Sequence, residues 1–488
     1  MDARSGGRSA KAAVGPPGGA AAPSAHRSAA VRLLVPGVAL AGLAVLALAV
    51  LVLALLGLTV LALLPGAANA APAAGGAGWN SIYPGPAGAP DPTAQAVVAA
   101  PDGSVFVAGL AGTGPTVPWL LKYDTAGDLL WHQGPSTPAA RSVTFAGLTP
   151  LPLGVLAWGV AGRDIRVERY QTASNRLWAV SIKGSSAPGG TPRDVAVDRG
   201  RHIYVAGSLG TRAGLRVRLV KLGGGGRVFW QRVGAAGELE SARIGAHGNV
   251  FACGWVVRGG RVCGLLTSYS PSGGRRWSVV DRHVGFSGLT AAPSGTVYVC
   301  GWQRMSATLT RALVRAYAPS GHLLWSRAAQ AEPGRSAYFA TLARDAGGGV
   351  VCAGTSVSVD NPLGLSEAPA DFLVARYGTN GTRTLLDTWA GQSGVEQDEV
   401  VGVECPASGG FLVCGDSLRY EGTSRLVVIP YDASGTRGLP LTHATAGSFE
   451  QARASVLTPT GPVIAGTVDA AGGGARQAIT VQFAYPGS

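Results

Sequence analysis

A short run of apolar residues that ends in a small residue and then glycine recurs along the chain. It reads VFVAG up to Gly109, VYVCG up to Gly301 and PVIAG up to Gly466. Apolar and polar positions alternate around each run, which predicts half-buried β-strands. A second such run, ending in a turn, comes before each of them, as in LTAAPSG before Thr296. The glycines are 47 to 61 residues apart and mark eight units: Gly109, Gly159, Gly207, Gly254, Gly301, Gly354, Gly415 and Gly466.

Each unit continues with a third apolar run, and most units then reach a tryptophan after a constant gap. The third run ends at Tyr123, Tyr170, Leu222, Tyr269, Tyr317, Tyr377, Tyr431 and Phe483. Eight residues further on lie Trp131, Trp178, Trp230, Trp277 and Trp325. In two later units Leu385 and Leu439 occupy that position. The constant gap predicts one turn type before a short fourth strand, with each Trp filling the space between neighbouring units.

Four-stranded units of this length, repeated eight times, predict an all-β fold, an eight-bladed β-propeller of four-stranded blades. The last unit stops at Ser488 without a fourth strand. Trp79 lies 52 residues before Trp131, which matches the period of the repeat. We therefore predict that Gly78–Tyr83 supplies the missing strand. Residues 78–488 then form one propeller, closed by an N-terminal strand and preceded by a hydrophobic helix.

Two segments carry a resemblance to a known repeat. Asp194–Gly207 reads DVAVDRGRHIYVAG, and Lys122–Trp131 reads KYDTAGDLLW. They resemble the SBBP-type β-propeller repeat of secreted bacterial proteins, and the resemblance extends over residues 78–488. It implies a propeller in an exported protein, and it implies no particular activity because propellers host many.

The Gly-x-x-x-Trp element is similar, more distantly, to the tryptophan-docking repeats of quinoprotein dehydrogenases. Those enzymes typically hold pyrroloquinoline quinone with a vicinal Cys-Cys disulfide and a bound Ca²⁺. This chain contains no Cys-Cys dipeptide. A divergent quinoprotein-like dehydrogenase is therefore disfavoured, and we expect no cofactor.

The N-terminal region predicts export. Residues 1–30 are rich in Gly, Ala, Ser and Pro and are expected to form a disordered cytoplasmic tail. Residues 31–65 are predicted to be a signal or membrane-anchor helix, because Leu33–Leu64 has no charged residue and is long enough to cross a bilayer. Residues 66–77 form a linker, and Ala68-Asn69-Ala70 fits a signal-peptidase site.

Two interpretations of this region stay open. Either the segment 33–64 remains as a membrane anchor, or the chain is secreted after cleavage near Ala70. Positive charges precede the segment, so both interpretations place the propeller outside the cytoplasm, at the cell surface or in the extracellular space.

Composition narrows the choice of partners. The formal net charge is +13, and a basic surface can attract anionic envelope polymers or nucleic acid. The basic residues are scattered along the strands, however, with no Lys/Arg run and no interleaved aromatic residues. We therefore expect no nucleic-acid partner. A monomer that binds an unidentified protein or envelope polymer is the favoured interpretation.

Motifs for catalysis or metal binding are missing from the sequence. It has no H-x-x-x-H or His/Cys ligand spacing, no D-x-D-x-D-G loop and no G-x-S-x-G elbow. No catalytic residue and no metal site are assigned. The alternative is an enzyme that acts on carbohydrate or another envelope polymer, with its site at the axial funnel. The ionisable residues to inspect there are Asp194, Asp198, Asp281, His283 and Glu404.

Six cysteines in an exported chain suggest disulfides. Cys253 and Cys263 flank a turn, as do Cys405 and Cys414, so each pair is a candidate for a cross-strand bond. The alternative is a buried thiol at a small-residue position. Cys253, Cys300 and Cys414 occupy the position that alanine takes in other units, for example Ala206.

One unit departs from the repeat through a long acidic loop, Thr355–Asp371, between its second and third strands. The connection to the next unit, GQSGVEQDE, is also acidic and emerges on the same face of an up-and-down blade. We therefore predict an acidic rim. It is either a binding site for a cation or basic partner, or a solvated loop. Its members are Asp360, Glu367, Asp371, Glu396, Asp398 and Glu399.

Overall fold

The chain divides into two compact units, Met1–Gly66 and Ala67–Ser488. The computed structural model describes residues 77–113, 116–134, 143–184, 189–330, 332–358, 369–391, 396–419, 423–469 and 474–485, all in the second unit. The predicted tail, the hydrophobic helix and the linker up to residue 76 lie outside the described residues. Among the helices that are described, none is long and apolar enough to cross a membrane.

The described residues form antiparallel sheets of strands that follow one another in the chain. The first sheet has β2 (Thr93–Ala99), β3 (Val105–Ala111), β4 (Val117–Tyr123) and β5 (Leu129–Gln133). The second has β6 (Val143–Leu151), β7 (Gly154–Ala161), β8 (Asp164–Tyr170) and β9 (Arg176–Ile182). Next come β10 (Thr191–Val197), β11 (Ile203–Thr211), β12 (Gly214–Leu222) and β13 (Val228–Ile244).

Strand β13 is long because it serves two sheets. It pairs with β12 along its first part and with β14 along its last part. A 3₁₀ turn, η1 (Ala246–Gly248), leads to β14 (Val250–Arg258), β15 (Arg261–Tyr269) and β16 (Arg275–Arg282). Another sheet contains β17 (Val284–Ala291), β18 (Val297–Arg304), β19 (Thr310–Tyr317) and β20 (Leu323–Ala329).

The remaining strands continue the pattern, with β1 returning to the last sheet. One group is β21 (Arg335–Arg344), β22 (Val350–Ser358), β23 (Ala370–Tyr377) and β24 (Arg383–Trp389). The next is β25 (Gln397–Glu404), β26 (Phe411–Leu418), β27 (Ser424–Tyr431) and β28 (Leu441–His443). In the last, β29 (Phe449–Thr458), β30 (Gly461–Asp469) and β31 (Arg476–Phe483) are completed by β1 (Ala77–Tyr83). Strand β1 thus takes the place predicted for Gly78–Tyr83.

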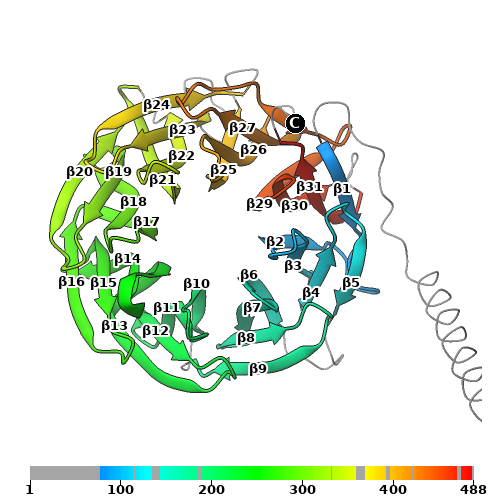
Figure 1. The fold of residues 1–488 in the computed structure, drawn as a ribbon, viewed down its shortest axis with the longest axis horizontal. Coiled ribbons are helices and arrows are strands. Elements are labelled where there is room, and N and C mark those ends of the chain that lie inside the picture. The colour runs from blue at the N-terminus through cyan, green and yellow to red at the C-terminus, as the bar shows by residue number, and fades with distance from the viewer. Residues whose placement is uncertain are drawn as a thin grey trace, which may run out of the picture. The chain divides into compact units, whose positions relative to one another are not determined.

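The sheets stand radially around a central opening, as in a β-propeller (Figure 1). The first strand of each group lies innermost, and it contacts the first strand of the next group. These contacts run from β2 through β6, β10, β13, β17, β21 and β25 to β29, and β29 contacts β2. The apolar clusters of the core lie between neighbouring groups, so each sheet buries its faces against the next.

The recurring glycine has a steric cause. Gly207 of β11 lies opposite Pro192, but the next residue, Ala206, lies opposite Asp194, so the inner strand bulges by one residue here. A Cβ atom on Gly207 would lie 1.9 Å from the carbonyl oxygen of Thr191. The same bulge faces Gly301 of β18. Only glycine fits, because the bulged backbone approaches its Cα atom too closely for a side chain.

The tryptophans dock onto the turn of the next unit. The indole Nε1 of Trp277 donates to the carbonyl oxygen of Pro319 at 2.8 Å, and its ring lies over Gly321, whose φ is +90°. A Cβ atom on Gly321 would lie 2.7 Å from the ring. The same bond recurs from Trp131 to Thr172, from Trp178 to Gly224, from Trp230 to Pro271 and from Trp325 to Thr379. Trp79 packs on Gly127 and Tyr123 in the same manner, although its Nε1 has no acceptor among the residues that the structure describes.

The two leucines at the Trp position are not equivalent. Leu385 in β24 is half-buried, packs against the neighbouring core and approaches Gly435. Leu439 lies outside the strands and is 87% exposed, because the short strand β28 begins only at Leu441. Leu439 therefore does not pack between units as the docked tryptophans do.

The two predicted disulfides are not formed. All six cysteines are free thiols. In the β14–β15 ladder Cys253 lies opposite Leu266, three residues beyond Cys263, and Cys414 lies opposite Gly402, three residues before Cys405. Three residues along a strand span about 10 Å, which is too far for a disulfide. Cys253, Cys300 and Cys414 are fully buried at the position that alanine takes elsewhere.

Candidate functional site

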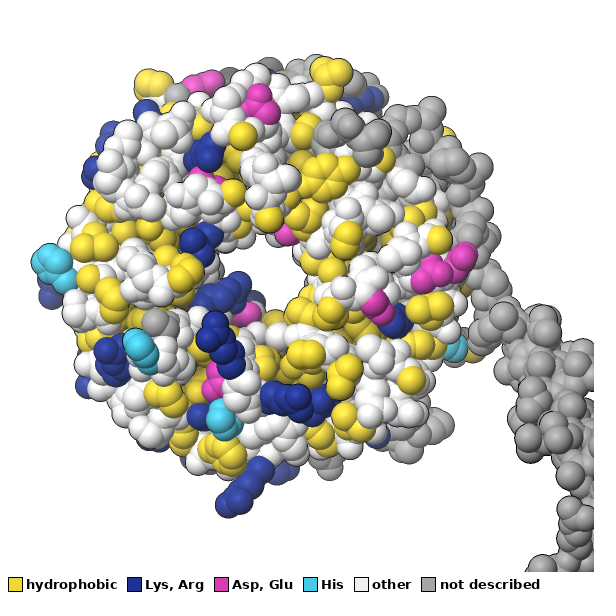
Figure 2. Space-filling model, in the orientation of Figure 1, with side chains coloured by type: hydrophobic (Ala, Val, Ile, Leu, Met, Phe, Trp, Pro, Cys, Tyr) yellow, Lys and Arg dark blue, Asp and Glu magenta, His cyan; other side chains and the backbone are white. Residues whose placement is uncertain are grey.

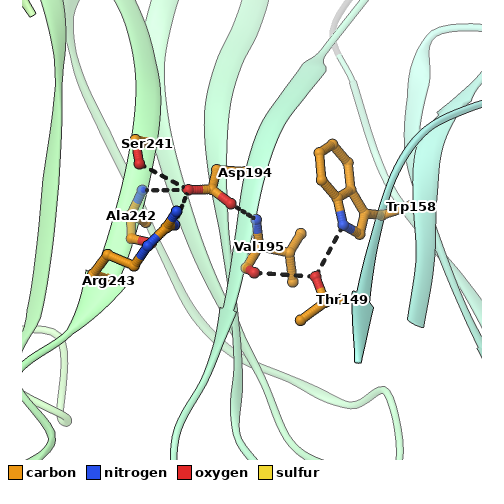
Figure 3. A network of polar contacts seen from close by, with 7 residues as sticks. All are labelled: Thr149, Trp158, Asp194, Val195, Ser241, Ala242 and Arg243. Carbon is orange, nitrogen blue, oxygen red and sulfur yellow. Dashed lines mark hydrogen bonds and ion pairs between the residues drawn. The ribbon is translucent and has the colours of Figure 1, made fainter. Parts of the chain in front are cut away.

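Asp194, one of the candidates for an axial enzyme site, joins inner strands instead (Figure 3). Its Oδ2 atom accepts hydrogen bonds from Ser241 Oγ and the Ala242 amide, both at 2.9 Å, and pairs with Arg243. Beside it, the Thr149 hydroxyl donates to the Val195 carbonyl oxygen, and the Trp158 indole N–H donates to the Thr149 hydroxyl oxygen. Asp194 therefore links β10 to β13, and its carboxylate is fully engaged.

The other candidates for an axial site do not converge. Asp281 lies in β16 at the outer edge of its sheet and pairs with Arg315. His283 follows that strand and is exposed. Asp198 accepts bonds from the His202 ring and the Tyr204 hydroxyl in a hairpin. Glu404 ends β25, accepts a bond from Ser455 Oγ at 2.8 Å, and burial raises its pKa. An active site built from these residues is not supported.

Two members of the predicted acidic rim are neutralised by arginines. Asp371 pairs with Arg335 at 2.7 Å. Glu396 is 1% exposed and is held by Arg425 at 3.3 Å and Arg419 at 3.6 Å, with Ser417 Oγ donating to it at 2.7 Å. They therefore act as structural ion pairs. Asp360 and Glu367 lie outside the described residues.

Gly391 makes room for the buried Glu396 carboxylate. A Cβ atom on Gly391 would lie 1.2 Å from Glu396 Oε2, so no other residue fits without moving that carboxylate. The Gly391 amide donates to Asp398 Oδ2 at 3.0 Å. The connection between β24 and β25 thus orients both Glu396 and Asp398.

The remaining rim residues, Asp398 and Glu399, line a hollow of about 690 Å³ between β21, β25 and β29. We call it the acidic hollow. Asp416 in β26 joins them, lying opposite Glu399 across the β25–β26 ladder. Tyr338 and Phe449, both half-buried, contribute aromatic walls. Three carboxyl groups and two aromatic rings from neighbouring units therefore surround one space at the start of the inner strands.

Asp398 is the least satisfied polar group in the acidic hollow. It is only 2% exposed, and its Oδ1 atom has no hydrogen-bond partner among the described residues. Burial raises its pKa to about 7, and the nearby Glu396 charge contributes to the shift. A pKa near 7 leaves Asp398 about half protonated at neutral pH.

Asp416 was missed by the sequence reasoning. It is 4% exposed, and its Oδ1 atom accepts a bond from the Ala452 amide at 3.1 Å. Burial raises its pKa well above the usual range, and the charge of Glu399 adds to this. A signal was present, because Asp416 directly follows the repeat glycine Gly415. The other units place Leu110, Val160, Ser208, Trp255, Trp302, Thr355 and Thr467 there.

Comparison with known proteins identifies neither a family nor a site for this chain. No family model and no curated protein matches the chain. Among solved structures it is similar to the Dos1 propeller, with 11% identity over 82% of this chain and 95% of the other, and a TM-score of 0.48. A Lactobacillus plantarum protein has 13% identity over 63% and 88%, with a TM-score of 0.41. A Bacteroides caccae protein of unknown function has 15% identity over 60% and 94%, with a TM-score of 0.34.

The chemistry of the acidic hollow suits an organic cation. In the described part of the chain, no three His, Cys, Asp or Glu side chains come together in a way that could hold a metal. Carboxyl groups flanked by aromatic rings suit an ammonium or guanidinium group, which pairs with carboxylate and stacks on a ring. Such a cation would also stabilise the ionised form of Asp398.

Proposed function

We propose that the chain is an exported, non-catalytic β-propeller that acts as a binding or scaffolding module at the cell surface. Its ligand would be a cationic group of a partner protein or envelope polymer, bound in the acidic hollow. The observation that carries this proposal is Asp398, a buried carboxyl that lines the hollow with an unpartnered oxygen atom. The other oxygen, Oδ2, accepts a bond from the Gly391 amide, so the unsatisfied atom is Oδ1. Leaving a buried carboxylate oxygen without a partner is costly, and such perturbed groups cluster at functional sites.

The finer architecture belongs to the same proposal. We infer eight blades in a ring closed by β1, as in the SBBP-type repeats that the sequence resembles. The order of contacts among the inner strands supports this, because β29 neighbours β2, and β1 pairs with β31. Such a ring is rigid, and a rigid ring presents the loops around the hollow in a fixed geometry.

A binding experiment with a defined cation tests this function. An end-blocked tri-arginine peptide is titrated into the full-length chain in detergent, with end-blocked tri-glutamine as the neutral control. We expect binding of the arginine peptide alone, weakened about tenfold or more by Asp398→Asn or Glu399→Gln. Asp432→Asn removes an exposed acid far from the hollow and should change nothing. Equal affinity in wild type and Asp398→Asn would overturn the proposal.

One specific observation supports the second candidate function, an enzyme that acts on envelope polysaccharide. Glycoside hydrolysis commonly needs one protonated carboxyl group beside an ionised one, and Asp398, with its pKa near 7, lies next to the exposed Glu399. A screen of envelope polysaccharides for new reducing ends separates the two functions. Release of reducing ends that disappears with Asp398→Asn would establish the enzyme. Peptide binding without any hydrolysis would establish the binding module.

The location rests on the uncharged segment Leu33–Leu64 and stays a proposal. Fractionation of cells into cytoplasm, membrane and medium tests it directly. Protein in the membrane fraction indicates an anchor, protein in the medium indicates cleavage near Ala70, and protein confined to the cytoplasm would overturn export.

A further inference from the structure

A second hollow, of about 850 Å³, lies at the other end of the inner strands. It is lined by the hairpin between β10 and β11, the turn between β13 and β14, residues that follow β17, and Arg344 at the end of β21. Strand β21 places Tyr338 in the acidic hollow and Arg344 here, six residues further on, which is about 20 Å along a strand. The two hollows are therefore separate sites, and we call this one the basic hollow.

The basic hollow has an excess of positive charge. Arg199, Lys221 and Arg344 line it together with His202 and His247. Asp198 is the one acidic residue among its described lining residues, and its carboxylate is already occupied by the ring of His202 and the hydroxyl of Tyr204. On the face that Figure 2 presents, Lys and Arg side chains gather at the central opening over β10, β13 and β17.

Lys221 is the group that distinguishes this hollow from an ordinary basic surface. It is 5% exposed, its Nζ donates to the Pro271 carbonyl at 2.9 Å and lies over the Tyr204 ring, and no carboxylate of the described residues pairs with it. Burial lowers its pKa. A buried ammonium group usually has a counter-charge, because desolvation penalises an isolated charge.

Lys122 in the first unit provides an internal comparison for Lys221. Lys122 occupies the same position in the first unit, is equally buried and lies over Phe106. Its Nζ has a carboxylate, Asp102 Oδ2, at 3.5 Å, supplied by the hairpin between β2 and β3. In the basic hollow the hairpin acid, Asp198, is turned to His202 and Tyr204 instead. Among the described residues Lys221 thus has no carboxylate within ion-pair distance, where Lys122 has one, and the charge of Asp198 acts on it from further away.

Arg344 adds an unused donor. Its Nε atom is buried and has no acceptor among the described residues. Arg199, on the neighbouring hairpin, is exposed and free to move toward a ligand. Two guanidinium groups and an ammonium group thus line one space, and these are the side-chain groups with which proteins bind phosphate oxygens.

We propose that the basic hollow is an anion-binding site that takes a multivalent oxyanion of the phosphate type, either free or as the terminal group of a larger ligand. The anion supplies Lys221 with a counter-charge at ion-pair distance and accepts hydrogen bonds from Arg199 and Arg344. This site is independent of the acidic hollow and of the cation proposed to bind there.

The test is a titration of the full-length chain in detergent with inorganic pyrophosphate, against chloride at the same ionic strength. A second arm uses glycerol 3-phosphate, so that a free anion and a phosphate carried on an organic group are compared. We expect pyrophosphate to bind in preference to chloride, with an affinity that falls as salt rises. The double variant Arg199→Gln/Arg344→Gln and the variant Lys221→Met should each weaken binding about tenfold.

Lys122→Met is the matched control, because it removes the equivalent lysine where a carboxylate already neutralises it. It should leave pyrophosphate affinity unchanged. Thermal unfolding of each variant identifies any loss of folding. If Lys221→Met does not fold, the double variant Arg199→Gln/Arg344→Gln still tests the site, because Arg199 is exposed and Arg344 is half-buried. Unchanged affinity in the arginine double variant, or an equal loss in Lys122→Met, would overturn the site.

Discussion

Each docked tryptophan joins two units through a single residue. The indole N–H reaches a turn carbonyl of the next unit, and the ring covers a turn residue that has positive φ and no side chain in most units. In the second unit Ser174, with φ of 74°, takes that glycine's place. The sequence shows Gly and Trp at a fixed spacing within one unit, but the ring covers the turn residue of the next unit, as Trp277 covers Gly321. The bond to the neighbouring turn was not readable from the sequence, because it depends on how adjacent sheets are placed.

Replacing Trp277 separates packing from hydrogen bonding. Trp277→Ala removes both the ring and its bond to the Pro319 carbonyl, and we expect a loss of about 3 kcal/mol in the free energy of unfolding. Trp277→Phe keeps most of the packing and should cost about 1 kcal/mol. Chemical denaturation measures both. Equal losses in the two variants would mean that the ring contributes nothing beyond its hydrogen bond.

At the scale of single strands, the sequence was informative where the repeat is regular. The apolar runs before Gly207 and Gly301 become β11 and β18, and the bulge opposite each glycine explains why the repeat needs that residue. The pattern did not indicate where β28 begins, and this short strand leaves Leu439 in solvent. Of the two alternatives for Cys253 and Cys414, the structure has the buried thiols. Flanking a common turn does not set the register of a ladder, and here the register keeps the thiols apart.

The two leucines at the Trp position provide a test at this scale. Leu385→Ala empties a packed position between β24 and the next unit, so we expect a loss of about 2 kcal/mol in the free energy of unfolding. Leu439→Ala removes an exposed side chain and should stay within about 0.5 kcal/mol of wild type. Urea denaturation measures the free energy of unfolding of both variants. A larger loss at Leu439 would show that it docks as the tryptophans do.

Across the whole molecule, two hollows of opposite charge lie at opposite ends of different inner strands. The acidic hollow lies where β25 and β29 begin, and the basic hollow lies where β10, β13 and β17 end. The sequence indicated the acidic residues Asp398 and Glu399 but not their partner Asp416, nor the basic hollow. Both depend on which units become neighbours, and spacing along one chain does not reveal how charges combine across several units.

Closure of the ring by β1 is testable without mutation. Strand β1 pairs with β31 along most of its length, so its amides should exchange with solvent as slowly as those of β31. Hydrogen–deuterium exchange followed by mass spectrometry measures both segments at once. Full exchange of peptides that cover Trp79–Tyr83 within seconds, while β31 stays protected, would contradict the proposed closure.

The central claim is that the acidic hollow binds a cation, and proton release on binding tests it most directly. Asp398 has a pKa of about 7 and is mostly protonated at pH 6. A bound guanidinium group favours the ionised form, so binding should expel up to about one proton, and affinity should rise with pH until about pH 8 and then level off.

The measurement is calorimetric titration of the full-length chain with end-blocked tri-arginine, near pH 6.5, in two buffers that differ in ionisation enthalpy. The account predicts that the observed heats differ between the buffers by the amount that release of up to about three quarters of a proton requires, and that Asp398→Asn abolishes this difference. Identical heats in both buffers for the wild-type chain, or an undiminished difference in Asp398→Asn, would contradict it.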